Sequence, residues 1–263
     1  MNALPLPPHA LGAQGREALR GLAGAHPLLA FDFDGTIAPI VDEPDAAFAP
    51  SEVAVALTRL SALAPVAVVT GRGVADAARR LGFAPQYLVG NHGMEGLPTG
   101  AGTPDLVAEA AVCRGWRDQL RAQGIGSEAD TAVRVEDKTL SLSVHWRGAV
   151  DEAAASAAVE AAAARLSPTP RRIAGKCVLN LLPPGARDKG DALAWLAAFE
   201  GAGAVLFVGD DVTDELAFEH APPGWITVRI GPFESTHARF RLDGQDEVAE
   251  LVEALVRTLG RVV

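Results

Sequence analysis

Two short acidic motifs follow apolar runs that are typical of buried strands. Asp32 and Asp34 come directly after the run 28–31, and Asp210 comes after the run 204–208. In an open α/β sheet, ligands bind outside the carboxyl ends of the parallel strands, so these carboxylates are expected to lie close together. Their oxygens suit a hard divalent cation such as Mg²⁺. Asp and Gly also favour turns, so either motif alone could be a turn without a chemical role.

Two further polar residues occupy comparable positions. Thr70 ends the apolar run 66–69, and Lys189 lies in the first turn of a predicted helix. With the carboxylates they could perform phosphoryl transfer, which needs a nucleophile, a metal ion and donors that neutralise the phosphoryl oxygens. Either residue alone could be an ordinary strand-end threonine or surface lysine. Their shared position beside strand ends favours a common site.

Each residue of this set can be given a role. Asp32 is the predicted nucleophile, which would form an aspartyl-phosphate, and Asp34 is the predicted general acid and base. Thr70 and Lys189 would bind the transferring phosphoryl group. The predicted metal ligands are Asp32, Asp34 and Asp210, with Asp211 and Asp214 behind them, either in direct contact with the metal or through water.

The elements that must position these residues alternate along the chain. Apolar runs predict strands at 28–31, 66–69, 87–89, 204–208 and 226–230. Apolar residues at helical spacing predict helices at 11–22, 51–63, 74–81, 187–199 and 247–259. The segment 209–215 is predicted to be a loop. This alternation predicts an α/β fold with a doubly wound, Rossmann-like parallel sheet.

The middle of the sequence has a different pattern. Helices are predicted at 105–123 and 151–166, and a further strand at 176–182. Between the helices, the segment 133–146 alternates apolar and polar residues, which is typical of an antiparallel hairpin with one wet face. We therefore predict an inserted α+β cap domain at 97–183, and a core domain formed by 1–96 and 184–263.

Composition limits the possible partners. The chain has 263 residues, of which 49% are hydrophobic, and a formal net charge of -10. No Lys/Arg-rich run could follow a phosphate backbone, so no nucleic-acid partner is expected. No apolar run reaches the length of a membrane span and no export leader is evident, so we expect no membrane partner and a cytoplasmic location. The two cysteines lack zinc spacing. The oligomeric state is not readable from the sequence.

The four acidic and polar motifs together resemble a known superfamily. Asp32-Phe33-Asp34-Gly35-Thr36, Thr70-Gly71-Arg72, Lys189 and Gly209-Asp210-Asp211 with Thr213-Asp214-Glu215 resemble the motifs of the haloacid dehalogenase superfamily of phosphatases. The segments 91–95, 136–147 and 175–176 are similar to those of the trehalose-6-phosphate phosphatase family. This resemblance implies hydrolysis of a small-molecule sugar phosphate, trehalose 6-phosphate, with Mg²⁺ as cofactor and an α/β cap that closes on the sugar.

The resemblance also implies a set of substrate-binding residues. They are Gly71, Arg72, Asn91, His92, Glu136, Lys138, His145, Lys176 and Asn180. Strand alternation places Glu136 and Lys138 on one face, so the hairpin and the strand after Lys176 are expected to present polar groups to the sugar. Asn180 and Leu182 stand where family members usually have Glu and Arg, which leaves the disaccharide open.

Three alternatives compete with this interpretation. A phosphatase of another phosphorylated sugar or glycoside would use the same core residues. A signalling receiver also gathers acidic residues, a Thr and a Lys on an α/β sheet, but it places its acidic pair before the phosphoacceptor and has no inserted cap. A dinucleotide-binding enzyme is disfavoured because Asp76 stands at the third small position after Gly71 and Gly73, where it would repel a pyrophosphate.

Overall fold

The structure is a computed structural model that describes residues 6–41, 43–98, 105–127, 133–175, 177–233 and 235–260. Its contacts divide the chain into two compact units, Met1–Leu97 with Asp188–Val263, and Pro98–Arg187. Each unit has its own sheet and its own buried cluster of apolar side chains. That the second unit acts as a cap stays a prediction.

The first unit is built on a parallel sheet with six strands among the described residues, in the order β10-β9-β8-β1-β2-β3. Its strands are β1 (Pro27–Phe31), β2 (Val66–Val69), β3 (Tyr87–Val89), β8 (Ala204–Gly209), β9 (Ile226–Ile230) and β10 (Phe240–Leu242). The chain order runs outward from β1 through β2 and β3 on one side and from β8 through β9 and β10 on the other, so it reverses between β1 and β8. The motifs that follow β1, β2 and β8 meet at the carboxyl edge of the sheet beside this reversal. The sheet confirms the doubly wound α/β fold.

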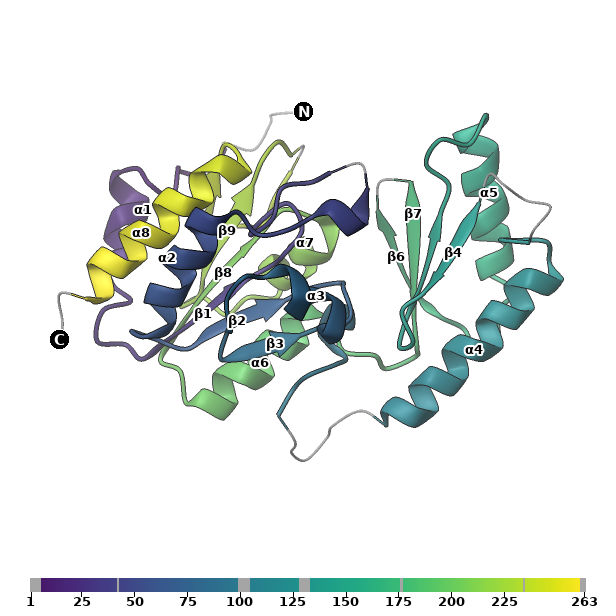
Figure 1. Cartoon of the computed structure of the whole chain (residues 1–263), viewed down its shortest axis with the longest axis horizontal. Coiled ribbons are helices and arrows are strands. Elements are labelled where there is room, and N and C mark those ends of the chain that lie inside the picture. The colour runs from purple at the N-terminus through teal and green to yellow at the C-terminus, as the bar shows by residue number, and fades with distance from the viewer. Residues whose placement is uncertain are drawn as a thin grey trace. The chain divides into compact units, whose positions relative to one another are not determined.

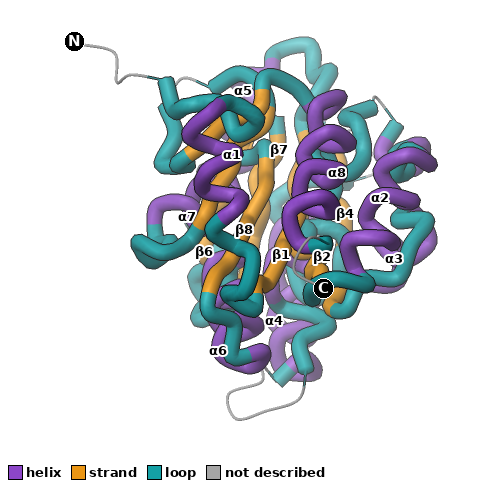
Figure 2. Tube along the Cα trace, turned by 90° about the vertical axis from the view of Figure 1, so that its left-hand side faces the viewer, coloured by secondary structure: helices purple, strands orange, loops and turns teal. Residues whose placement is uncertain are grey.

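Helices cover both faces of this sheet (Figure 1). They are α1 (Ala13–Arg20), α2 (Ser51–Ser61), α3 (Val74–Arg80), α6 (Lys189–Glu200), α7 (Val212–Glu219) and α8 (Val248–Leu259), with short 3-10 turns η1 (Pro44–Ala46), η2 (Asn91–Gly93) and η3 (Gln245–Glu247). Alternate residues of β1 point to opposite faces: Leu29 and Phe31 pack with α1, α2 and α8, and Leu28 and Ala30 pack with α6 and α7. Figure 2 shows α1 and α8 in front of the strands.

The second unit has an antiparallel sheet in the order β4-β5-β7-β6. It consists of β4 (Arg134–Asp137), β5 (Leu142–His145), β6 (Arg171–Gly175) and β7 (Val178–Leu182), with helices α4 (Leu106–Ala122) and α5 (Glu152–Ala163). One sheet face is apolar and packs on these helices, with Leu142, Val144 and Leu179 against Trp116 and Val159. The other face carries polar residues. The predicted hairpin at 133–146 is therefore confirmed.

The predicted elements needed four corrections. Val212–Glu219 forms α7, so Asp214 lies in the first turn of a helix and not in a loop. β6 was not predicted because Ile173 is its only buried residue, and β10 was not predicted because it has three residues at a sheet edge. The strand predicted at 176–182 begins at Val178. Within the described ranges, every helix is too short or too polar to span a bilayer.

Candidate active site

A buried lysine joins two carboxylates at the carboxyl edge of the sheet. The Nζ atom of Lys189 lies 2.8 Å from Oδ1 of Asp32 and 2.7 Å from Oδ1 of Asp214. Lys189 begins α6, which Asp188 and Asp191 cap through reciprocal bonds to each other's backbone N–H groups. The capping box fixes the first turn of the helix and aims the lysine at the end of β1.

The loop after β8 is held by Asp214 in the first turn of α7. Oδ2 of Asp214 accepts from the backbone N–H groups of Asp210 and Asp211, both at 3.0 Å. A Cβ atom on Gly209 would lie 2.4 Å from the Asp214 carboxylate, so only glycine permits this approach. Asp214, which is fully buried, therefore orders the loop and the lysine. Asp211 is an exposed helix N-cap.

Carboxylate oxygens of Asp32, Asp210 and Asp214 lie within 4.8 Å of one another. Oδ1 of Asp210 is buried and has no hydrogen-bond partner among the residues that the structure describes. Gly35 has φ of +75°, and a Cβ there would lie 2.0 Å from Oδ2 of Asp210. Glycine at this position therefore allows the β1 loop to reach the Asp210 carboxylate.

The charges in this cluster do not balance. If all three carboxylates were ionised, they and the ammonium of Lys189 would leave two negative charges in this site. Burial raises the pKa of Asp32 well above its usual range, and Lys189 lowers it only in part. Burial, followed by the charges of Asp214 and Asp211, raises the pKa of Asp210 to about 8. An all-oxygen site with this excess charge and an unpartnered carboxylate oxygen fits a hard divalent cation.

Asp34 points to a different partner from Asp32. Its two carboxylate oxygens accept from Nε and Nη2 of Arg72, both at 2.7 Å. Arg72 also donates to Asp76 at 2.9 Å, and its guanidinium carbon lies 5.4 Å from the ring centre of Phe33. Burial alone lowers the pKa of Arg72, but its bonds to Asp34 and Asp76 raise it above the usual value. The guanidinium is thus ionised and held on three sides.

The loops after β2 and β3 are bonded to each other. The backbone N–H of His92 donates to the carbonyl of Thr70 at 2.9 Å, and that of Asn91 donates to the carbonyl of Arg72 at 2.8 Å. The Thr70 hydroxyl is buried and accepts from the N–H of Arg72. A Cβ on Gly71 would lie 2.6 Å from the His92 ring. These residues therefore form one packed turn beside the carboxylate cluster.

The comparisons with known proteins agree with this geometry. A model of the trehalose-phosphatase family matches residues 30–246, which include every strand-end motif described above. The chain belongs to the trehalose-phosphatase family. It is 36% identical to the trehalose-phosphate phosphatase of Mycobacterium avium over 92% of its own length, and it spans 65% of the length of that relative.

Solved structures share the trehalose-phosphatase fold. The C-terminal domain of the Candida albicans trehalose-6-phosphate phosphatase superposes with a TM-score of 0.74 at 22% identity, covering 98% of this chain and 99% of that domain. A trehalose-6-phosphate phosphatase related protein superposes with a TM-score of 0.71 at 24% identity, covering 89% of this chain and 98% of the other. At these identities the likeness shows the fold alone.

The second unit of this trehalose-phosphatase chain places some of the predicted sugar-binding residues on one sheet face. Glu136, Ser143 and Asn180 are in register across β4, β5 and β7. Oε2 of Glu136 lies 2.9 Å from Nε2 of His145, and this bond lowers the pKa of Glu136 to about 2 despite burial. The hydroxyl of Ser143 donates to Oδ1 of Asn180 at 2.7 Å.

The structure does not place two of the residues predicted for this face on it. Lys138 lies beyond the end of β4, in the turn that its own N–H closes onto Ser141, so strand alternation does not place it on the face of Glu136. Lys176 lies outside the described residues. Sugar binding by the residues of both units stays a prediction.

The structure adds partners that sequence reasoning missed. Asp76 and Arg80 form ion pairs behind Arg72, and Glu95 accepts from the Asn91 amide at 2.9 Å. The spacing Arg72-x₃-Asp76-x₃-Arg80 is a signal for the first set, because residues four apart lie on one face of a helix. Nothing in the sequence links Glu95 to Asn91 beyond proximity. Ser143 could have been found by pairing the hairpin with the strand at Asn180.

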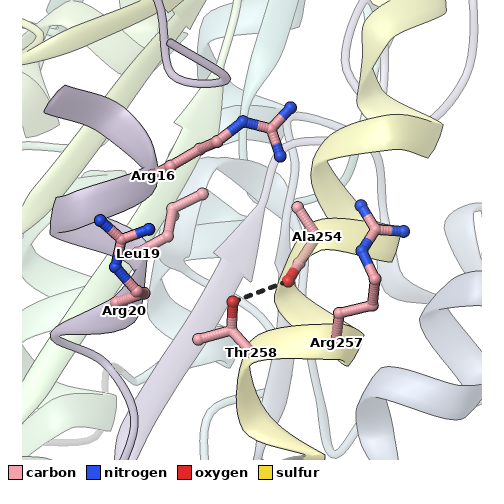
Figure 3. A pocket seen from close by; sticks show the side chains of 6 residues that line it. All are labelled: Arg16, Leu19, Arg20, Ala254, Arg257 and Thr258. Carbon is pink, nitrogen blue, oxygen red and sulfur yellow. Dashed lines mark hydrogen bonds between the residues drawn. The ribbon is translucent and has the colours of Figure 1, made fainter. Parts of the chain in front are cut away.

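Two other features of the described chain are not part of this site. A pocket of about 160 Å³ lies between α1 and α8 and is lined by Arg16, Leu19, Arg20, Ala254, Arg257 and Thr258 (Figure 3). It contains no carboxylate, and Arg16 and Arg20 already pair with glutamates. His9 approaches Glu247 at 3.1 Å, but its Nδ1 accepts from the N–H of Leu11, so Nε2 carries the proton and donates. That group is a hydrogen bond between a neutral imidazole and a carboxylate.

Proposed function

We propose that this chain is a magnesium-dependent phosphatase that hydrolyses trehalose 6-phosphate to trehalose and inorganic phosphate through an aspartyl-phosphate. The observation that carries the proposal is the buried cluster in which Lys189 bridges Asp32 and Asp214 beside Asp210. Membership of the trehalose-phosphatase family and similarity to the trehalose-phosphate phosphatase of Mycobacterium avium support the substrate.

The metal ion would be held by Asp32 and Asp210, with the loop at Asp34 beside them. Asp214 has both oxygens occupied, one by Lys189 and one by two backbone N–H groups, so it would order the ligands without replacing them. A divalent cation carries the two positive charges that the cluster lacks. When bound, it would screen the charge between the nucleophile and the phosphoryl oxygens.

The first chemical step would transfer the phosphoryl group to Asp32. A carboxylate oxygen of Asp32 attacks phosphorus, the bond between phosphorus and the sugar oxygen breaks, and Asp34 gives its proton to the leaving oxygen. In-line transfer keeps the attacking and leaving oxygens on opposite sides of phosphorus. The carboxyl of Asp34 stands outside the cluster around Asp32, as a group serving the leaving side should.

The second step would regenerate the enzyme. Water attacks the phosphorus of the aspartyl-phosphate and gives a proton to Asp34, and the bond between phosphorus and the Asp32 oxygen breaks to release phosphate. Lys189 would neutralise negative charge on the phosphoryl oxygens in both steps, because Asp32 and Asp214 keep it ionised: burial lowers its pKa, but their charges raise it above the usual value. Thr70 would add a hydroxyl donor.

Another phosphorylated sugar is the second candidate substrate, and Asn180 is the reason to test it. Its Oδ1 accepts from Ser143, which leaves the Nδ2 group to donate. A carboxylate at this position would accept from sugar hydroxyls instead. A change from acceptor to donor on the polar face would alter which sugar hydroxyl pattern is preferred, without affecting the carboxylate cluster.

A panel of phosphorylated sugars, assayed for phosphate release with Mg²⁺ and with a chelator, tests the proposal. We expect trehalose 6-phosphate to have the highest kcat/KM, no release without a divalent cation, and a loss of at least about 10⁴-fold in Asp32→Asn. Asp118→Asn is the matched control, because Asp118 is an exposed aspartate on α4. If folded Asp32→Asn released phosphate as fast as Asp118→Asn, the assignment of Asp32 as the nucleophile would be refuted. If another sugar phosphate had a higher kcat/KM than trehalose 6-phosphate, that compound would be assigned as the substrate instead.

A further inference from the structure

The side chains of Arg72, Asp76 and Arg80, spaced four residues apart, connect Asp34 to Asp45, which follows it in the chain before α2. Arg72 precedes α3, Asp76 lies in the first turn of α3, and Arg80 is its last residue. Nη1 of Arg72 lies 2.9 Å from Oδ2 of Asp76, and Nε of Arg80 lies 3.0 Å from each oxygen of the same carboxylate. Asp76 therefore joins two arginines on one face of the helix.

At one end of this row, Arg72 fixes the carboxyl of Asp34. Two parallel bonds of 2.7 Å form a fork that allows one orientation of the carboxylate. The Arg72 side chain is only 12% exposed and lies over Phe33, so it cannot easily turn away. The Asp34 side chain is 42% exposed, so its outer lone pairs remain open for proton transfer.

At the other end, Arg80 holds the segment that follows the Asp34 loop. Nη1 of Arg80 donates to the carbonyl of Asp45 at 2.6 Å, and Nη2 lies 2.8 Å from Oδ1 of Asp45. The Arg80 guanidinium also lies over Phe48, and the Arg80 carbonyl accepts from Ala49. The chain between Asp34 and α2 is thus tied at both ends to one row of alternating charges, which begins just before α3 and continues along it.

We propose that Asp76 and Arg80 are positioning residues that act through Arg72 to orient Asp34 for proton transfer to the leaving sugar. This inference rests on the proposed function, because it takes Asp34 as the general acid. Asp76 neutralises and aligns the guanidinium, and Arg80 fixes Asp76 against the 44–49 segment. The fork then holds the Asp34 carboxyl on the leaving-group side, where a small misplacement lowers proton transfer strongly.

The test compares two leaving groups. An alkyl phosphate such as trehalose 6-phosphate needs a proton on the leaving oxygen, whereas p-nitrophenyl phosphate loses a stable phenolate without one. The value of kcat/KM is used because it reports on steps up to loss of the leaving group and excludes hydrolysis of the aspartyl-phosphate. We expect Asp76→Asn to lower kcat/KM for the sugar phosphate about 10-fold to 100-fold, and for the aryl ester less than about 3-fold.

Matched variants separate positioning from stability. Arg79→Ala removes an exposed contact to the same Asp76 oxygen, and we expect a change below about 2-fold for both esters. Arg80→Lys keeps the charge, so it serves where Asp76→Asn does not fold. In an Asp34→Asn background, Asp76→Asn should cause no further loss, because the residue it positions is already without a proton to give.

The outcomes are distinguishable. If Asp34→Asn itself loses activity equally on both esters, the general-acid assignment in the proposed function is wrong. If Asp34→Asn discriminates between the esters but Asp76→Asn and Arg80→Lys do not, the positioning role is overturned and the row is structural only. Independent, multiplicative losses in the double variant would overturn it as well.

Discussion

Replacing Lys189 by methionine should destabilise the core of the protein as well as abolish turnover. The ammonium is 3% exposed and lies within 2.8 Å of two carboxylates that are themselves buried. Methionine keeps the length and apolar stem of the side chain, so little packing is lost. What changes is that Asp32 and Asp214 face each other without the cation that now separates them.

The magnitude follows from the burial of this pair. Removing one partner of a buried ion pair leaves an uncompensated charge and costs about 3–5 kcal/mol. That is a large part of a typical stability of about 5–15 kcal/mol. With a urea slope of about 3 kcal/mol per M, the unfolding midpoint should fall by about 1 M or more. Because the chain has two compact units, unfolding of the unit that contains Lys189 must be measured separately from unfolding of the other unit.

Hydrogen exchange of β1 and β8 peptides at increasing urea provides that measurement, because these strands are buried and paired in the core sheet. Arg257→Met is the matched control: it removes an exposed cation from the last turn of α8 and should change the stability by less than about 0.5 kcal/mol. Adding Asp214→Asn to Lys189→Met should restore at least about 1 kcal/mol, since the repulsion is then relieved.

A midpoint for Lys189→Met within about 0.3 M of the control would refute this reasoning. The carboxylates would then be protonated or solvated in the native state, and the lysine would not be their counterion. Equal stability of the single and double variants would show that the loss came from packing and not from charge.

Three further predictions concern single positions and the metal site. Gly35→Ala should destabilise the core by more than about 1 kcal/mol and lower turnover at least about 10-fold, because φ is +75° and the new Cβ would lie 2.0 Å from Asp210; thermal unfolding and phosphate release measure both. Burial raises the pKa of Asp76, but its bonds to Arg80 and Arg72 lower it to about 2. These bonds should therefore contribute about 1 kcal/mol of stability at neutral pH, after allowance for solvent screening, and this contribution should be lost as the pH falls from about 4 through about 2. Asp76→Asn should not show this loss of stability at low pH. Mg²⁺ at millimolar concentration should raise the melting temperature, and a chelator should reverse the rise, since a cation that binds only the folded site stabilises it.

Each of these has a direct contradiction. Wild-type activity in Gly35→Ala would mean that the Asp210 carboxylate moves freely. If Asp76→Asn lost as much stability at low pH as the unaltered protein does, the ion pairs of Asp76 would not be the cause of that loss. A melting temperature that responds equally to Na⁺ and Mg²⁺ at matched ionic strength would show screening instead of a site.

Sequence reasoning found the core of the candidate site because its residues follow strands. The apolar runs at β1, β2 and β8 are unambiguous, and parallel strands bring their carboxyl ends together whatever the details of packing. Sequence position alone therefore grouped Asp32, Lys189, Asp210 and Asp214 correctly. Residues placed by loop and hairpin geometry were predicted less well. Lys138 lies in a turn, because the register of β4 and β5 ends the strand at Asp137.

The amino-acid sequence by itself determined the fold class, since local apolar patterns encode it, and the residue types at the strand ends predicted the kind of chemistry. Only the tertiary structure decided which charges pair. The fork of Arg72 on Asp34 joins residues 38 positions apart, and the use of both Asp214 oxygens depends on how α6 and α7 pack beside the sheet. The physical reason is that hydrogen bonds and ion pairs depend on distances of a few ångströms, which chain order does not specify but packing does.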